Sequence, residues 1–327
     1  MKNIDFRKRY AAIIVVGMLM MTSLVSCEKA ESNIDVISKD MTKPGVVTNV
    51  KVENLNGSAK ITYSLPNSQN LLYVLARYNI SDDRVRETKS SYYTDTIAVD
   101  GFARAQEYEV TLYAVSRANV MSDPVVVKVN PKTPDYLLIN SDLEITPDFG
   151  GASFFGLNKN RAPIAVHLLV FNELTKKYDA QETEYISSNI IDVAIRNLPP
   201  TPQKVGVFTT DRFGNVSDTV FKTLTPLFEA QLDKSKFFVY PLANDTPSDY
   251  GWVFENFFDG RVDGNGWHTS RSARLISTFG LGTSAIISRF VVWQRPPDYY
   301  GYQNPHNFTI WGSNKDNPVE TTLPRGS

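Results

Sequence analysis

The chain has 327 residues and a formal net charge of −1, with 42% hydrophobic and 21% charged residues. These proportions are ordinary for a folded globular protein and exclude a chain that is disordered or collagen-like throughout. At about 100–200 residues per domain, the length predicts two or three domains. The balanced charge shows no basic excess of the kind that marks a nucleic-acid binder, and we expect no nucleic-acid partner.

The N-terminal segment has the pattern of a secretory signal peptide. Basic residues lead into an apolar run at 11–21, which is much shorter than the ~20 residues that a membrane-spanning helix needs. Residues 24–27 read Leu-Val-Ser-Cys, which resembles the lipobox of bacterial lipoproteins. That resemblance implies lipidation at Cys27, the only cysteine in the chain. An ordinary signal peptide with an incidental cysteine is the alternative.

The lipobox interpretation fixes the first boundaries and the location. We predict a signal peptide at 1–26 and a polar, flexible tether at 27–43. Several acyl chains hold a protein stably in a bilayer, so the mature protein would be anchored by lipid in the outer membrane. Glu28 and Glu31, just after Cys27, resemble the export signal of surface-exposed lipoproteins, which implies exposure at the cell surface.

From residue 44 onward, short alternating runs replace any long helical periodicity. The runs at 46–52, 60–66, 71–78 and 108–115 alternate or are rich in β-branched and aromatic residues, and Asn56-Gly57 supplies a hairpin turn. Such strands with frequent turn signals predict an all-β sandwich.

The strand pattern then repeats at a spacing of about 95 residues, close to the length of one immunoglobulin-type sandwich. Residues 73–79 are echoed by 165–172, and residues 116–123 by 211–218. Prolines near 131–134 and at 226 mark the boundaries, because proline interrupts a central strand. We therefore predict two tandem sandwiches, at 44–133 and 134–226.

The first sandwich resembles the fibronectin type III family. Tyr108 lies on the strand where that family places its tyrosine corner, whereas the second copy has Lys204 near the corresponding position. In this region we interpret Tyr63, Tyr108 and their neighbours as core residues. His167 lies in an apolar strand and is interpreted in the same way.

All four tryptophans lie beyond residue 250, in a segment with a different composition. It contains an Asn-x-x-Asp-Gly turn at 256–260, a following Trp267, Ile-Ser-Arg-Phe at 287–290 and a run ending in Gly-Ser at 312–313. These features in this order resemble the coagulation-factor-5/8 type C, or discoidin, domain. The resemblance covers 229–327 and implies a jelly roll that is incomplete at its C-terminal end. Trp267 matches a core position of that family, and Trp293 and Trp311 lie in expected strands, so we interpret all three as packing residues.

Discoidin relatives often bind sugars through loops, and the residue types around 295–304 suit that chemistry. A pyranose stacks its C–H face on an aromatic ring and hydrogen-bonds through its hydroxyls. Prolines 296 and 297 stiffen the loop, which lowers the cost of ordering it on binding. The predicted carbohydrate-binding residues are Arg295, Asp298, Tyr299, Tyr300 and Tyr302, with His268 and Arg271 from the loop after Trp267. Packing of these tyrosines is the alternative.

The same resemblance implies a structural calcium near the Asp-Gly turn, with Asp259 and Asp263 as its carboxylate ligands. An EF-hand does not fit, because Arg261 stands at the third position and Ser270 where the bidentate glutamate belongs. A solvated turn without calcium is the alternative.

No catalytic motif accompanies these features, and we expect a protein that is not an enzyme. The three-part order resembles surface lipoproteins encoded beside glycan-import systems, which implies a glycan or oligosaccharide ligand bound by the third segment, with the sandwiches as spacers. The alternative is an assembly subunit of an outer-membrane nutrient-uptake complex that contacts a transporter and binds no sugar.

Overall fold

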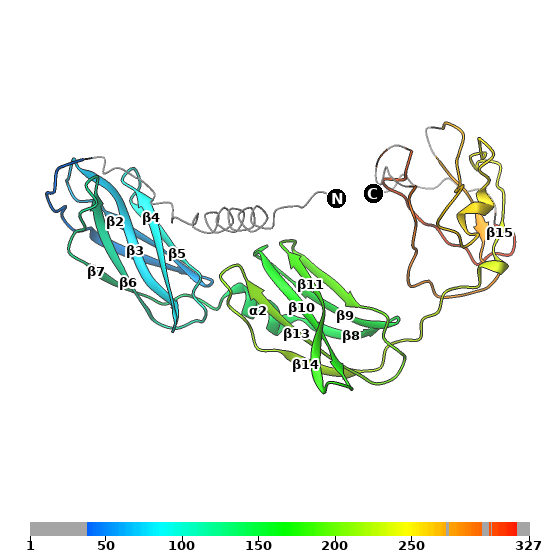
Figure 1. Ribbon diagram of the computed structural model, residues 1–327, viewed down its shortest axis with the longest axis horizontal. Helices are drawn as coiled ribbons and strands as arrows, with labels where there is room; N and C mark the ends of the chain where they lie inside the picture. The colour runs from blue at the N-terminus through cyan, green and yellow to red at the C-terminus, as the bar shows by residue number, and fades with distance from the viewer. Residues whose placement is uncertain (1–37, 273–274, 296–300, 302, 319–327) are drawn as a thin grey trace, which may run out of the picture. The chain divides into compact units, whose positions relative to one another are not determined.

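The computed structural model describes residues 38–272, 275–295, 301 and 303–318 (Figure 1). The prediction of an all-β protein is confirmed, and the contacts divide the chain into two compact units. One unit holds residues 1–138 with 213–215, and the other holds 139–212 with 216–327. The predicted signal peptide and Cys27 lie outside the described residues. Within them, no helix has the length and apolar character needed to cross a membrane.

The first unit contains a sandwich of two antiparallel sheets. One sheet has the order β1-β2-β5 and the other β4-β3-β6-β7. The strands are β1 (Thr48–Leu55), β2 (Ser58–Ser64), β3 (Leu71–Ser81), β4 (Arg84–Ser91), β5 (Thr96–Asp100), β6 (Tyr108–Ser116) and β7 (Val125–Val129).

The core of this sandwich follows from strand alternation. In β2 the buried positions are Ala59, Ile61 and Tyr63, and their neighbours face outward. Val74 of β3 and Leu112 of β6 face them from the other sheet in the same buried cluster. Because side chains alternate between the two faces of a strand, one apolar face per sheet is enough to fill this core.

The second unit repeats this arrangement strand for strand. Its sheets have the orders β12-β9-β8 and β11-β10-β13-β14, which correspond to β5-β2-β1 and β4-β3-β6-β7 (Figure 1). The strands are β8 (Glu144–Asp148), β9 (Gly151–Leu157), β10 (Ile164–Asn172), β11 (Lys177–Ile186), β12 (Ile190–Ile195), β13 (Gln203–Asp211) and β14 (Val220–Leu224).

A serine hydroxyl holds the same turn in both copies of the repeat. Ser122 Oγ accepts from the Ala114 amide at 3.0 Å and donates to the Asp123 carbonyl at 2.8 Å. In the second copy, Ser217 Oγ accepts from the Thr209 amide at 2.9 Å and donates to a carbonyl at 2.9 Å. The sequence echo between 116–123 and 211–218 therefore reflects one hydrogen-bonded turn built twice.

A left-handed glycine closes each sandwich. Gly57 has φ +55°, donates to the Lys132 carbonyl at 2.9 Å and accepts from the Phe102 amide at 3.1 Å. Gly150 has φ +58°, donates to the Leu227 carbonyl at 2.8 Å and accepts from the Leu198 amide at 2.9 Å. Each glycine thus joins a hairpin turn to two distant segments, and only a residue that tolerates positive φ fits there.

The tyrosine corner is present in the first sandwich alone. The Tyr108 hydroxyl accepts from the Arg104 amide, four residues upstream, at 3.1 Å, which is the hydrogen bond that defines this corner. In the second sandwich Lys204 is exposed, and its ammonium lies 4.5 Å from the centroid of the Phe171 ring. The departure noted in the sequence is therefore a real difference between the copies.

Two further regions complete the described structure. The short helix α2 (Asp135–Asp142) follows Pro134, whose carbonyl accepts from Leu137 and Leu138. In the third segment, the strands are β15 (Phe238–Val239) and β16 (Phe279–Gly280), with the 3-10 turns η1 (Lys234–Lys236) and η2 (Phe254–Phe257). The predicted jelly roll stays a prediction, because the described part of this segment forms one short strand pair.

We predict that Ser122→Ala and Ser217→Ala each lower the free energy of unfolding by about 1–3 kcal/mol, because each leaves a buried backbone amide without its acceptor. Urea unfolding measures this. Ser188→Ala is the control: Ser188 is exposed and bonds only the nearby Ile190 carbonyl, so it should cost about 0.5 kcal/mol or less. An equal effect at all three positions would contradict the role assigned to the repeated hydroxyl.

His167 gives the second sandwich a pH-dependent component of stability. Its ring nitrogens lie 3.0 Å from the hydroxyls of Thr183 and Thr210, and its ring stacks on Phe208 at 4.4 Å. Burial lowers the pKa of His167, so the unfolded chain binds a proton more readily than the folded one. The stability from this group is therefore complete above its unfolded pKa and falls as the pH drops through that value.

We accordingly expect His167→Gln to reduce the loss of stability that acidification from about pH 7 to pH 5 causes, since histidine has an ordinary pKa of about 6.5. Chemical unfolding at a series of pH values measures the slope. The exposed His306 provides the matched control, and His306→Gln should leave the slope as it is. If His167→Gln leaves the pH dependence of the free energy of unfolding unchanged, His167 is not the source of that dependence.

Candidate functional site

The most distinctive local structure of the third segment is a tight turn that displays an aromatic side chain. Residues 249–252 read Asp-Tyr-Gly-Trp, and the Trp252 amide donates to the Asp249 carbonyl at 3.0 Å. Tyr250 has φ +55° and Gly251 φ +73°, the pair of positive values that defines a type I′ turn. Glycine accepts this conformation freely, but a tyrosine there is strained by about 1–3 kcal/mol. The strained side chain is 75% exposed.

His268 packs beside this turn and is held by several hydrogen bonds. Its backbone pairs with the turn, because its carbonyl accepts from the Asp249 amide at 2.8 Å and its amide donates to the Trp252 carbonyl at 3.2 Å. Its ring meets the Tyr250 ring edge-on at 4.8 Å between centroids and the Trp252 ring at 6.4 Å. The imidazole is thereby fixed between two aromatic side chains.

Arg295 reaches the same place from a distant part of the chain. Its guanidinium carbon lies 5.3 Å from the centroid of the Trp252 ring, a cation–π distance. Gln303 also arrives there, with Oε1 at 3.3 Å from Nε2 of His268. We call Tyr250, Trp252, His268, Arg295 and Gln303 the aromatic–basic cluster.

One side chain joins the two ends of the segment 295–304. Asn304 Oδ1 accepts from the Arg295 amide at 2.9 Å, and Asn304 Nδ2 donates to the Arg295 carbonyl at 3.0 Å. The adjacent Gln294 adds a bond from Nε2 to the Pro305 carbonyl at 2.8 Å. Because the amide of Asn304 imitates a backbone partner, it clamps the base of this segment.

Two of the predicted carbohydrate-binding residues, Arg295 and His268, therefore come together around Trp252. Arg271 is exposed and takes part in none of the contacts that define the cluster. The remaining predicted residues, Asp298, Tyr299, Tyr300 and Tyr302, lie outside the described residues, and their role stays a prediction.

The predicted calcium ligands lie in an ion-paired turn. Asp259 Oδ1 accepts from the Arg261 amide at 2.8 Å, and Arg261 Nε lies 3.7 Å from Asp263 Oδ1. Over the described ranges, no group of three or more His, Cys, Asp or Glu side chains could hold a metal. These contacts favour a solvated turn in which the Arg261 guanidinium supplies the positive charge near the carboxylates. Calcium binding here stays a prediction.

The other tryptophans divide into two kinds. Trp267 packs on Phe254 at 4.6 Å and on Phe257 at 5.7 Å, as expected for a core residue. The expectation that Trp293 and Trp311 also lie in core strands is not met, because they are 61% and 53% exposed. The described residues around them form no strand ladder, so there is no second sheet to cover them.

Sequence reasoning missed Tyr250, Trp252 and Gln303. A signal was present, since Asp-Tyr-Gly-Trp combines a turn pattern with two large aromatic residues at 249–252. The convergence of this turn with Arg295 was not visible, because Trp252 and Arg295 are 43 positions apart and no periodic pattern pairs them.

Three family models match the chain, each over part of its length. They are described as a domain of unknown function (DUF4959) over residues 44–131, a domain of unknown function (DUF5126) over 132–235, and a domain of unknown function (DUF5000) over 254–324. Within the aromatic–basic cluster, His268, Arg295 and Gln303 lie in the third match, and Tyr250 and Trp252 lie just before it. None of the curated proteins matches the chain.

Several solved structures resemble the chain in part. The SusE-like protein BT2857 is 29% identical, with 51% of this chain and 63% of that chain covered and a TM-score of 0.32. A two-domain fibronectin type III segment of chicken tenascin is 11% identical, with 55% of this chain and 99% of that chain covered and a TM-score of 0.26. The FN1–FN3 domains of chicken CNTN1 are 12% identical, with 57% of this chain and 68% of that chain covered and a TM-score of 0.26.

We predict that Tyr250→Gly leaves the free energy of unfolding unchanged or raises it by about 1 kcal/mol, because glycine adopts positive φ without strain. The matched control is Tyr185→Gly in β11, where the tyrosine is 84% exposed in a regular strand and glycine should cost about 0.5–1 kcal/mol. Urea unfolding of both variants gives the comparison. A clear destabilisation by Tyr250→Gly would contradict the strain assigned to the turn.

Proposed function

We propose that this protein is a non-catalytic, lipid-anchored surface protein that captures carbohydrate through its third segment for uptake by the cell. The observation that carries the proposal is the exposed Tyr250, displayed on a strained turn beside His268 and Trp252. Strained residues persist where the surrounding structure holds them, and they concentrate at ligand-binding sites.

The chemistry of the aromatic–basic cluster suits a sugar. Tyr250 offers an exposed ring to the apolar C–H face of a pyranose, and its hydroxyl can exchange hydrogen bonds with the sugar. Arg295 and Gln303 add planar donors and acceptors of the kind that vicinal hydroxyls need. Binding would use a surface that is already arranged, which reduces the entropy lost on association.

The remainder of the chain would hold this segment away from the membrane. In this proposal Cys27 carries the lipid, residues 27–43 act as a flexible tether, and the two sandwiches are spacers. The predicted loop residues Asp298, Tyr299, Tyr300 and Tyr302 would extend the sugar-binding surface. Location at the outer face of the outer membrane follows from the same proposal.

A second candidate function is that of an assembly subunit of an outer-membrane nutrient-uptake complex. It is favoured by a group of rings in the second sandwich: Tyr178 contacts Phe171 at 5.1 Å and Phe221 at 4.5 Å, and Phe221 is 55% exposed. Exposed apolar side chains that gather on one sheet often mark protein contacts.

We expect Trp252→Ala and Arg295→Ala each to reduce retention of the full chain in affinity gels that contain polysaccharide, because they dismantle the cluster around His268. The combined change of Tyr299, Tyr300 and Tyr302 to Ala should do the same. Loss of one stacking or charge-assisted contact costs about 1–3 kcal/mol, which is roughly tenfold or more in affinity.

Trp311→Ala is the matched control, since Trp311 is a half-exposed tryptophan of the same segment outside the cluster. Retention that survives the cluster variants and falls with Trp311→Ala would overturn the site. Retention by none of a broad panel of polysaccharides, together with recovery of a transporter by Phe221-dependent pull-down, would instead favour the assembly subunit.

A further inference from the structure

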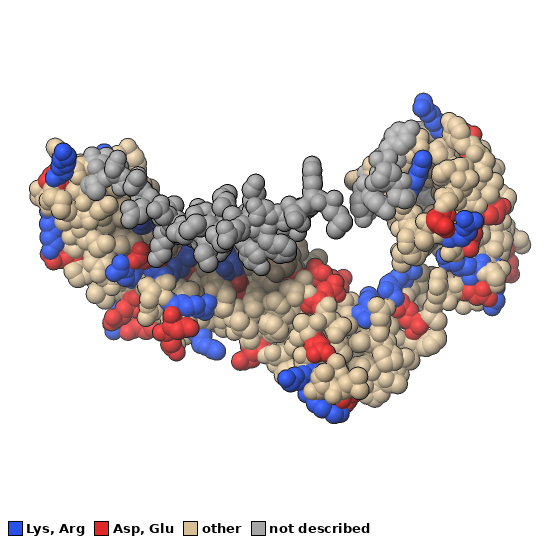
Figure 2. Space-filling model, in the orientation of Figure 1, with Lys and Arg blue, Asp and Glu red and all other residues tan. Residues whose placement is uncertain are grey.

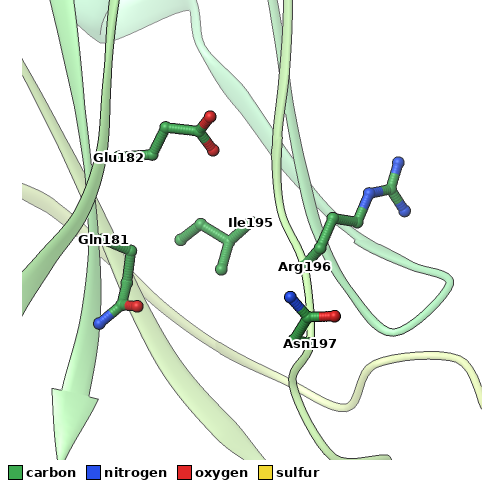
Figure 3. Close-up of a pocket in the computed structure, with 5 residues that line it drawn as sticks. All are labelled: Gln181, Glu182, Ile195, Arg196 and Asn197. Atoms are coloured by element: carbon green, nitrogen blue, oxygen red, sulfur yellow. The ribbon is translucent and has the colours of Figure 1, made fainter. Parts of the chain in front are cut away.

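The second sandwich has an open pocket at one side, beside β11 and β12, each of which is the edge strand of its sheet. The pocket has a volume of about 300 Å³ and is lined by Gln181 and Glu182 of β11 and by Ile195, Arg196 and Asn197 at the end of β12 (Figure 3). The volume lies at the lower end of the range for small-ligand pockets, enough for one sugar ring and too little for a longer chain.

A β-bulge aims two neighbouring side chains into this pocket. Leu168 of β10 pairs with Glu182, and the next residue, Leu169, pairs with Ala180, so that Gln181 is the extra residue in β11. In a regular strand, Gln181 and Glu182 would point to opposite faces. Here both line the pocket, and bulges often re-aim side chains in this way beside binding sites.

The opposite wall is also set by a special backbone conformation. β12 ends at Ile195, a buried residue at the back of the pocket. Asn197 follows with φ +64°, a left-handed conformation that turns its amide side chain relative to the strand before it. Figure 3 shows the Gln181 and Asn197 amides on opposite sides of the Ile195 side chain.

The arginine of the pocket is compensated, and the carboxylate of the pocket lies near a second carboxylate. Arg196 Nη1 lies 2.8 Å from Asp148 Oδ2 and 2.8 Å from the Phe149 carbonyl, so its guanidinium is anchored and neutralised. Burial and the neighbouring Glu184 raise the pKa of Glu182. An anionic ligand would therefore meet the Glu182 and Glu184 carboxylates beside an arginine that is already neutralised, whereas amides and carboxylates serve hydroxyl groups that both donate and accept.

We propose that this pocket binds one neutral pyranose unit, with its hydroxyls on Gln181, Glu182 and Asn197. The site is separate from the aromatic–basic cluster and would give the second sandwich a binding role beyond that of a spacer. The choice of a sugar as its ligand rests on the proposed function, but the pocket uses none of the residues of that site.

The probes are methyl α-pyranosides of D-glucose, D-galactose and D-mannose, titrated into the full-length protein through the millimolar range. Labelled Gln and Asn side chains report binding in ¹H–¹⁵N spectra, and the signals of Gln181 and Asn197 are assigned by their absence in Gln181→Ala and Asn197→Gly. We expect saturable shifts of both signals with at least one glycoside. Asn197→Gly should weaken that binding about fivefold, the loss of roughly one hydrogen bond.

Glycine accepts the positive φ of position 197, so Asn197→Gly should fold normally. Asn119→Gly is the matched control, because Asn119 is a left-handed asparagine of the first sandwich with φ +58°, and this variant should bind as the parent does. No shift of the Gln181 and Asn197 signals with any of the three glycosides would overturn the pocket, as would binding that Asn197→Gly leaves unchanged.

The Trp252→Ala protein separates this inference from the proposed function. Shifts at Gln181 and Asn197 that persist in Trp252→Ala support an independent pocket, even if polysaccharide retention is lost. Conversely, retention that depends on Trp252 while the pocket signals stay fixed supports the proposed function and refutes the pocket.

Discussion

Each sandwich depends on a backbone constraint at one glycine. Gly57 and Gly150 adopt positive φ, and their amide and carbonyl groups join the first hairpin to two segments from elsewhere in the domain. A Cβ at Gly57 would lie 3.1 Å from Cβ of Pro134, in addition to the strain of the left-handed conformation. Both copies therefore close the first hairpin against distant parts of the same sandwich through a residue that must tolerate positive φ.

The sandwiches could be predicted from the sequence because their signals are local and occur twice. Alternation in the strands, the Asn56-Gly57 turn and the echo of 116–123 in 211–218 all report contacts between residues close in the chain. Ser122 and Ser217 show that even a hydrogen-bonding role can be carried by such an echo. The tyrosine corner was predictable for the same reason, since Tyr108 bonds a residue four positions away.

The candidate sites were harder to predict, because their residues meet only through tertiary structure. Arg295 and His268 were recognised by residue type, but the turn that holds Tyr250 and Trp252 was not, since its strain is a property of the backbone. The exposure of Trp293 and Trp311 was missed because an apolar strand pattern predicts burial without saying which surface covers it. The pocket at Gln181 depends on a bulge, which leaves no mark in residue composition.

The clamp formed by Asn304 has a consequence for how this surface could change. Its amide pairs with the main-chain nitrogen and oxygen of Arg295, and this pairing places no requirement on the side chains between the two residues. The pairing of Asn304 with Arg295 would therefore tolerate substitutions at the positions between them, because its donors and acceptors on Arg295 belong to the main chain.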